Sequence, residues 1–222
     1  MRETRRERSP RMETSPEETP EELLDKGFSG LESVESDIER INIETPPTRI
    51  DIFWKEAECR IEWLEKAGGK LIDEGIKMRR DGILEQGGEE IRRGIMTLTR
   101  ALSLRERIIR SGGRVRGFTE EVRIQREKQR EYLRRFLYLV LKAEILGYEN
   151  RSSSEIEKQE IRNTRDKIKG RLKAWEQSLA GSEEEKKRVP QKLNKQIKEW
   201  EKELKSQRNN TEKEGSKTSG FY

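Results

Sequence analysis

The side chains best suited to bind a charged ligand are arginines and lysines that gather between residues 100 and 135. This stretch carries twelve basic and five acidic residues, a net charge of +7, whereas the whole 222-residue chain carries +5. Guanidinium groups hold phosphate in a planar fork of donors, and several together release counterions from a nucleic acid. We therefore predict a site for RNA or another polyanion here, which we call the basic corner. Its members are Arg107, Arg110, Arg114, Arg116, Phe118, Arg123, Arg126, Lys128 and Arg130.

Acidic residues interleave with these cations, so other interpretations of the stretch stay open. Glu106, Glu127 and Glu131 lie within a helical turn of arginines, so the stretch could instead be a solvated face whose charges pair with one another. An acidic protein is a further candidate partner. Phe118 and Tyr132 stand beside the cations, where they would be available to stack on bases.

The chain lacks the residue types of most catalytic and metal sites. It has no histidine and one cysteine, Cys59, which excludes histidine-based triads, zinc fingers and an intrachain disulfide framework. The paired glycines lack the spacing of phosphate-binding loops. With 44 acidic residues, neighbouring carboxylates are expected by chance. We predict no catalytic residue, no metal site, no cofactor and no enzyme activity.

The elements that must position these side chains all read as helices, so the expected fold class is all-α. The stretch from Tyr132 to Leu146 is apolar on nearly every side, which is typical of a buried central helix. Apolar residues at helical spacing predict further helices over residues 48–76 and 89–110, and a basic helix that leads from residue 119 into the central stretch. Glycines within residues 82–88 predict a turn, and the pair Gly68-Gly69 marks either a break or a close packing point.

A C-terminal helical hairpin or coiled coil is expected over residues 150–208. Ser154 with Glu157 fits a capping box, and Val189-Pro190 is expected to mark a boundary between helices. The apolar stripes of this segment are narrow, so we expect them to bind a protein partner or a second copy of the chain. The residues concerned are Ile168, Leu172, Trp175, Leu193, Ile197 and Trp200.

Polar composition at both ends predicts disordered tails. The hydrophobic fraction is 30% and the charged fraction 42%, and five of the six prolines lie within residues 1–47. The expected organisation is a disordered arm over residues 1–47, a helical core domain over 48–149, the hairpin over 150–208 and a disordered tail over 209–222. Apolar residues from Leu31 to Ile41 indicate a transient helix in the arm that could dock on a partner.

Two functional hypotheses follow. The first is a non-enzymatic regulatory or accessory protein that binds RNA or another polyanion through the basic corner. Under it, Lys192, Lys195 and Lys198 should matter much less, because they sit among glutamates on a separate helix. The second is a helical scaffold that binds proteins through its terminal helices and N-terminal arm, with no nucleic acid.

Composition and the start of the chain add two expectations. Heavy use of Arg, Glu, Lys, Gly and Ile around a small helical centre is similar to the composition of some viral accessory proteins. No secretory signal opens the chain, so we expect an intracellular protein, cytoplasmic or nuclear, that does not enter a membrane.

Overall fold

The structure is a computed structural model that describes residues 18–115, 117, 119–148 and 153–218, with the backbone alone over 211–218. All regular elements within these residues are helices, so the all-α fold class is confirmed. None of these helices is both long enough and apolar enough to cross a lipid bilayer. The elements are α1 (Pro20–Phe28), α2 (Leu31–Glu39), α3 (Pro47–Arg80), α4 (Leu84–Gly112), α5 (Thr119–Lys142), the π-helical η1 (Ala143–Tyr148), α6 (Glu155–Leu179) and α7 (Glu183–Thr218).

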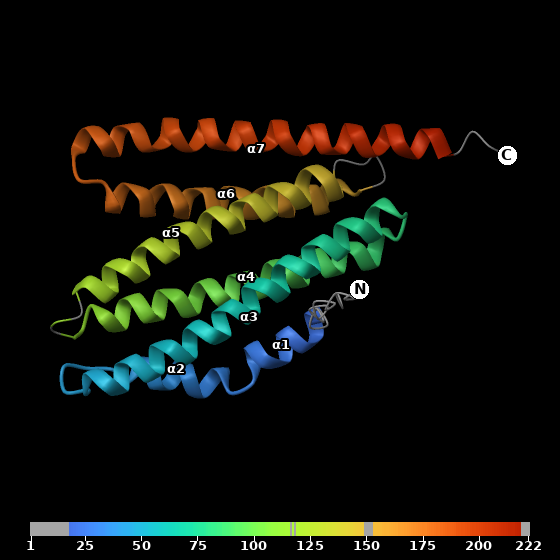
Figure 1. Cartoon of the computed structure of the whole chain (residues 1–222). Coiled ribbons are helices and arrows are strands. Elements are labelled where there is room, and N and C mark those ends of the chain that lie inside the picture. The colour runs from blue at the N-terminus through green and yellow to red at the C-terminus, as the bar shows by residue number, and fades with distance from the viewer. Residues whose placement is uncertain (1–17, 116, 118, 149–152, 219–222) are drawn as a thin grey trace, which may run out of the picture.

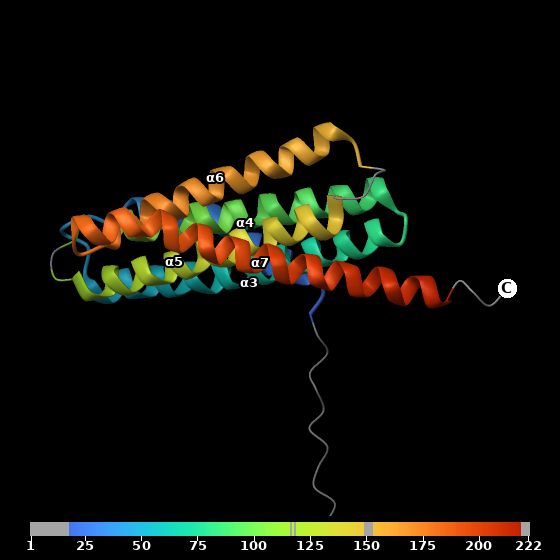
Figure 2. The same cartoon turned by 90° about the horizontal axis from the view of Figure 1, so that it is seen from above.

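The helices stack in layers, with the long pair α3 and α4 in the middle (Figure 1). The short helices α1 and α2 pack on one side of α3, and α5 packs on α4. Helix α6 covers α5, and α7 is the outermost helix on that side, lying across the bundle when it is seen from above (Figure 2). Because α7 is the outermost helix, other helices pack on only one of its sides.

Glycines allow α3 and α4 to approach at backbone contact. Gly68 and Gly75 of α3 face Gly94 and Gly87 of α4, and each pair is spaced by seven residues so that both members lie on one helix face. A Cβ atom on Gly75 would lie 2.5 Å from the carbonyl oxygen of Gly87. The prediction of a turn over residues 82–88 is therefore wrong beyond residue 83, because α4 already begins at Leu84 and uses its glycines for packing.

The N-terminal arm is ordered where α1 and α2 form. Thr19 and Glu22 close a capping box at the start of α1, and Leu23 and Ile38 are 1% exposed in the core. Short helices are marginally stable in isolation, and the burial of these apolar side chains against α3 stabilises α1 and α2. The expected disordered arm is thus wrong for residues 20–39, and residues 1–17 lie outside the described part of the chain.

The apolar stretch that was expected to be central is buried as predicted. Phe136, Leu137 and Val140 are 0% exposed. The stretch begins within α5 and ends in the π-helical turn η1.

One buried arginine joins this region to three other segments. Arg79, 2% exposed, donates from Nε to the Gly147 carbonyl (2.8 Å) and from Nη1 to the Leu84 carbonyl (2.8 Å). Its Nη2 donates to Ser153 Oγ (2.6 Å), and its guanidinium lies 4.0 Å from the centre of the Tyr148 ring. The end of α3, the start of α4, η1 and the segment before α6 therefore share one cation.

Helices α6 and α7 form the expected C-terminal pair, and the Ser154–Glu157 capping box is confirmed. Pro190 does not end a helix. It lies inside α7, and the Lys186 carbonyl, which cannot bond to a proline nitrogen, accepts instead from Gln177 Nε2 of α6 (3.3 Å). The expected tail over residues 209–222 is helical as far as Thr218. A coiled-coil geometry for the pair stays a prediction.

Candidate functional site

The described members of the basic corner lie on the C-terminal part of α4, on the residues that follow it and on α5, and carboxylates from other helices reach several of them. Arg107 pairs with Glu39 of α2, and its Nε lies 3.9 Å from Glu35 Oε1. Lys128 Nζ lies 2.5 Å from Glu58 Oε1 of α3. Carboxylates of α2 and α3 therefore neutralise part of the positive charge of the basic corner.

The same neutralisation extends across all of residues 100–135. Arg105 binds Glu65 of α3 (2.6 Å), and Arg134 binds Glu176 of α6 (2.6 Å). Counting Arg171, which pairs with Glu106 from outside the stretch, the net charge of +7 falls to +3 when the five carboxylates that arrive from outside are included. They are Glu35, Glu39, Glu58, Glu65 and Glu176.

Three arginines of the corner have no carboxylate partner within the described residues: Arg110, Arg114 and Arg126. Arg123 and Arg130 instead form local pairs on the surface of α5, with Glu120 (2.7 Å) and Glu127 (2.8 Å). Exposed pairs of this kind contribute about 0–1 kcal/mol, so a phosphate can compete for the arginine. Arg116 and Phe118 lie outside the described residues.

The expected stacking role of Tyr132 is wrong, because its ring is in the core. It is 3% exposed, its hydroxyl donates to the Leu98 carbonyl, and the Arg105 guanidinium lies 5.3 Å from its ring centre. Burial, the largest influence, raises the pKa of the Tyr132 hydroxyl well above 10.0. A neutral buried tyrosine here supports the fold rather than a ligand.

The ion pair between Glu58 of α3 and Lys128 of the basic corner is reflected in the pKa of the Glu58 carboxyl. Burial by itself would raise the pKa of the Glu58 carboxyl. Hydrogen bonds from Lys128 Nζ and Gln125 Nε2, both 2.5 Å, together with the positive charges of Lys128 and Arg105, outweigh that effect, so the pKa is lowered below the usual 4.5. Glu58 therefore stays ionised at neutral pH and cancels Lys128.

A second set of cations runs along the outward face of α7, and we call it the α7 ridge. On an ideal helix its members fall within an arc of about 140°, opposite the buried side chains of Leu193, Ile197 and Leu204. All of them are exposed, and Lys195 with Glu199, at 4.0 Å, is the one ion pair that any of them forms with the described residues. The ridge consists of Lys187, Arg188, Lys192, Lys195, Lys198, Lys202 and Lys205.

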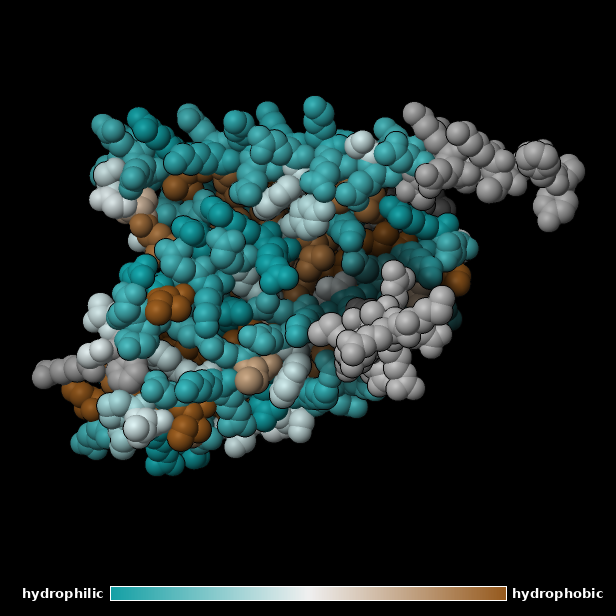
Figure 3. Space-filling view, viewed as in Figure 1, coloured by the Kyte–Doolittle hydropathy of each residue, from teal (hydrophilic) through white to brown (hydrophobic). Residues whose placement is uncertain are grey.

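No other element neutralises the α7 ridge within the described residues. Residues 186–208 carry nine basic and three acidic residues, a net charge of +6. The helix packs on α5, η1 and α6 through its apolar side, and the surface over it is almost entirely hydrophilic (Figure 3). Among the described residues, Lys192 and Lys198 have no carboxylate within 4.0 Å, so the glutamates near them in sequence do not neutralise them by ion pairing.

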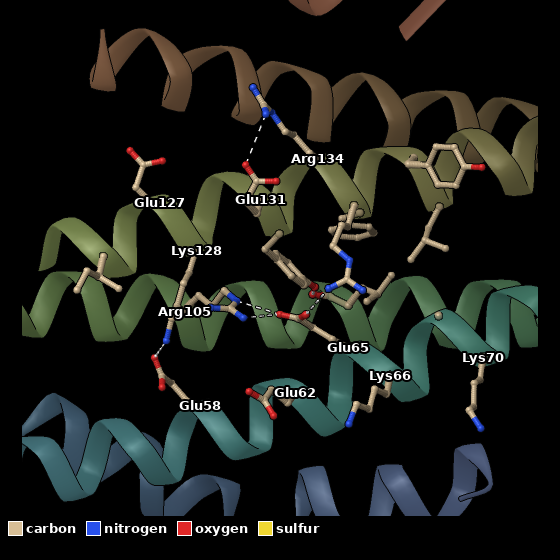
Figure 4. Close-up of a pocket in the computed structure, with 18 of the residues that line it drawn as sticks. Glu58, Glu62, Glu65, Lys66, Lys70, Arg105, Glu127, Lys128, Glu131 and Arg134 are labelled. Atoms are coloured by element: carbon tan, nitrogen blue, oxygen red, sulfur yellow. Dashed lines mark hydrogen bonds and ion pairs between the residues drawn. The ribbon is translucent and has the colours of Figure 1, made fainter. Parts of the chain in front are cut away.

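A groove of about 1250 Å³ runs between α3, α5 and α7. Figure 4 shows the charged side chains of its walls turned toward one another, with Arg105 on Glu65 and Lys128 on Glu58. Leu139 and Trp200 contribute apolar surface to its lining. Cations and carboxylates alternate along this groove, so it lacks the uniform charge of the α7 ridge.

The residues expected to bind a protein partner lie within the chain's own packing. Four are 0–7% exposed: Ile168, Leu172, Leu193 and Ile197. Trp175 donates from Nε1 to the Arg126 carbonyl (3.1 Å), and Trp200 packs edge-on against Tyr138 with ring centres 5.6 Å apart. The prediction of a free interaction surface is thus corrected: these side chains hold α6 and α7 to each other and to α5.

The α7 ridge is the feature that sequence reasoning missed, although a signal for it existed. From Arg188 on, its cations recur at intervals of three or four residues, which keeps them on one helix face. Counting charge along the chain hid this, because Glu199, Glu201 and Glu203 fall between the lysines in sequence. Comparison with protein-family models, with curated proteins and with solved structures finds no match to this chain.

Proposed function

We propose that this chain is a non-enzymatic accessory protein that binds RNA or another polyanion, with the α7 ridge as its main contact. The observation that supports this is the row of seven exposed cations, of which Lys195 alone has a carboxylate of the described residues within 4.0 Å. Unpaired cations on a convex surface contact phosphates without first giving up an internal partner. Each contact releases counterions and so favours binding.

The basic corner takes a secondary part in this proposal. Arg110, Arg114 and Arg126 remain open to a phosphate, whereas Arg107 and Lys128 are held by carboxylates of α2 and α3. The scaffold hypothesis has less support, because the apolar stripes it would use are buried in the core.

A binding titration of the full chain against fluorescein-labelled RNA at four salt concentrations, from 50 to 300 mM, tests the proposal. Seven phosphate contacts predict a slope of log K against log salt of about −6 on a duplex, and a shallower slope on a single strand. A scaffold that binds proteins by apolar burial would show no such affinity for RNA. Absence of binding at 50 mM salt contradicts the proposal.

A matched pair of variants separates site-specific binding from general basicity. The test variant carries Lys192→Glu, Lys195→Glu and Lys198→Glu. The control variant makes the same change in net charge at Lys55, Lys77 and Arg80, which are exposed cations of α3. Equal weakening by both variants would mean that net charge, and not the α7 ridge, drives binding.

A further inference from the structure

The shape and chemistry of the α7 ridge bear on which polyanion it fits. From Lys187 to Lys205 the ridge spans about 27 Å, at 1.5 Å per residue. Phosphates on one strand of a nucleic-acid duplex follow at about 3.4 Å along the axis, so the ridge matches about 8 base pairs of a rigid rod. Its cations lie on one side of a continuous helix, in a fixed line rather than on separate loops.

Proteins that bind single strands stack the bases on aromatic rings, and the ridge offers no such platform. Within residues 186–208 the sole aromatic residue is Trp200, which is turned inward against Tyr138. On α6, Trp175 is tied to the Arg126 carbonyl, and Tyr132 of α5 is buried. Among the described residues of this face, the bases of a single strand would therefore find no ring to stack on.

The cation type points the same way. Six of the seven ridge residues are lysines, whose ammonium groups act as point charges on flexible stems. The planar fork of arginine suits bidentate reading of a base edge, whereas the ammonium of lysine, although it can donate to guanine, imposes no such plane. Lysines in a row instead suit phosphates, which are alike at every base pair.

From these three observations we infer that the α7 ridge binds double-stranded nucleic acid through its phosphates, without base recognition. This inference rests on the proposed function and narrows it to one ligand class. RNA and DNA duplexes share the chemistry that the ridge would contact, so the experiment carries both. The bound segment is about 8 base pairs, and affinity falls for shorter duplexes.

Competition anisotropy with the full chain at 100 mM salt tests the inference. The probes are a 16-base-pair RNA duplex, the DNA duplex of the same sequence, a second RNA duplex of shuffled sequence and an unstructured 16-nucleotide oligouridine. We expect at least one duplex to bind tenfold or more tightly than oligouridine, with no difference between the two RNA sequences. A duplex preference for RNA or for DNA then identifies the source of the ligand.

Oligouridine binding as tight as both duplexes would overturn the inference and leave the proposed function standing, whereas no binding by any probe would overturn both. A variant with Lys192→Gln, Lys195→Gln and Lys198→Gln should flatten the salt slope for the duplex by about 3 units. The matching Lys55→Gln, Lys77→Gln and Arg80→Gln variant should leave the slope unchanged. Circular dichroism verifies that both variants fold.

Discussion

Residues 100–135 hold twelve cations and residues 186–208 hold nine, and the fold places them in different electrostatic settings. The first stretch lies where α4 and α5 meet α2, α3 and α6, and five carboxylates from those helices pair with its cations. The second lies on the outermost helix, whose neighbours contact its apolar side alone. The number of packed neighbours, rather than the number of cations, decides how much charge a helix presents to solvent.

The largest effect on stability is expected at Arg105, a cation of residues 100–135 that lies outside the basic corner. Arg105→Ala should lower the free energy of unfolding by about 3 kcal/mol, because Glu65, whose side chain is 16% exposed, would keep only its longer contact with Arg135 at 3.9 Å. Lys198→Ala on the ridge should change it by about 0.5 kcal/mol or less, since that side chain is exposed and unpaired. Urea denaturation of both variants measures the difference. Equal losses would erase the distinction between a structural and a free cation.

The largest effect on binding is expected on the ridge. Removing three phosphate contacts with Lys192→Glu, Lys195→Glu and Lys198→Glu should weaken polyanion binding about a hundredfold at 0.15 M salt. Charge reversal to glutamate at Arg110, Arg114 and Arg126 should also weaken polyanion binding, but by a several-fold smaller factor than the ridge variant. Anisotropy titrations of the two triple variants rank the regions. The reverse ranking would return the site to the basic corner.

The glycine contact between α3 and α4 brings Glu65 within reach of Arg105, and its loss should loosen the corner. Gly75→Ala should cost about 1–3 kcal/mol, because the added Cβ meets the Gly87 carbonyl oxygen at 2.5 Å. Gly170→Ala is the control: a Cβ there meets nothing within 4 Å, so the better helix propensity of alanine should stabilise α6 by up to about 1 kcal/mol. Thermal melts with the same sign for both would refute the backbone contact.

The smallest expected effect concerns pH. The pKa of Glu58 is lowered, so its pair with Lys128 stabilises the fold fully above pH 4.5 and loses that contribution as pH falls through the lowered value. The stability difference between the wild type and Glu58→Gln should therefore be constant from pH 7 to 5 and shrink toward pH 3. Lys198→Gln should show a difference that does not depend on pH. A Glu58→Gln difference that persists unchanged at pH 3 contradicts the pairing.

Periodicity predicted the helices well where a stripe is broad and local. The buried stretch around Phe136 and the Ser154 capping box could be read directly, because each depends on residues close in sequence. The first turns of α4 could not, since glycine favours turns locally and becomes acceptable in a helix only when another backbone packs on it. A helix was predicted from Leu31 to Ile41 only as a transient one, and the stable order of α1 and α2 was missed for the same reason: their stability comes from packing on α3.

The candidate site also has a part that depends on residues close in sequence and a part that depends on tertiary packing. The cations of the basic corner are visible in sequence, but Glu39 and Glu58, which cancel two of them, lie 68 and 70 residues away. Such pairs depend on tertiary placement and leave no local pattern. The α7 ridge depends on one helix alone and could have been found from its angular spacing.

Arg79 has a consequence for how the molecule comes apart. Its guanidinium satisfies carbonyls of Gly147 and Leu84 and the hydroxyl of Ser153 at the same time. If either the α3–α4 pair or the start of α6 melts, some of these bonds break and the packing around the guanidinium opens, so each region loses stabilisation that the other supplies. The two halves are therefore thermodynamically coupled, and the chain should lose its structure in one cooperative transition instead of shedding the C-terminal helices first.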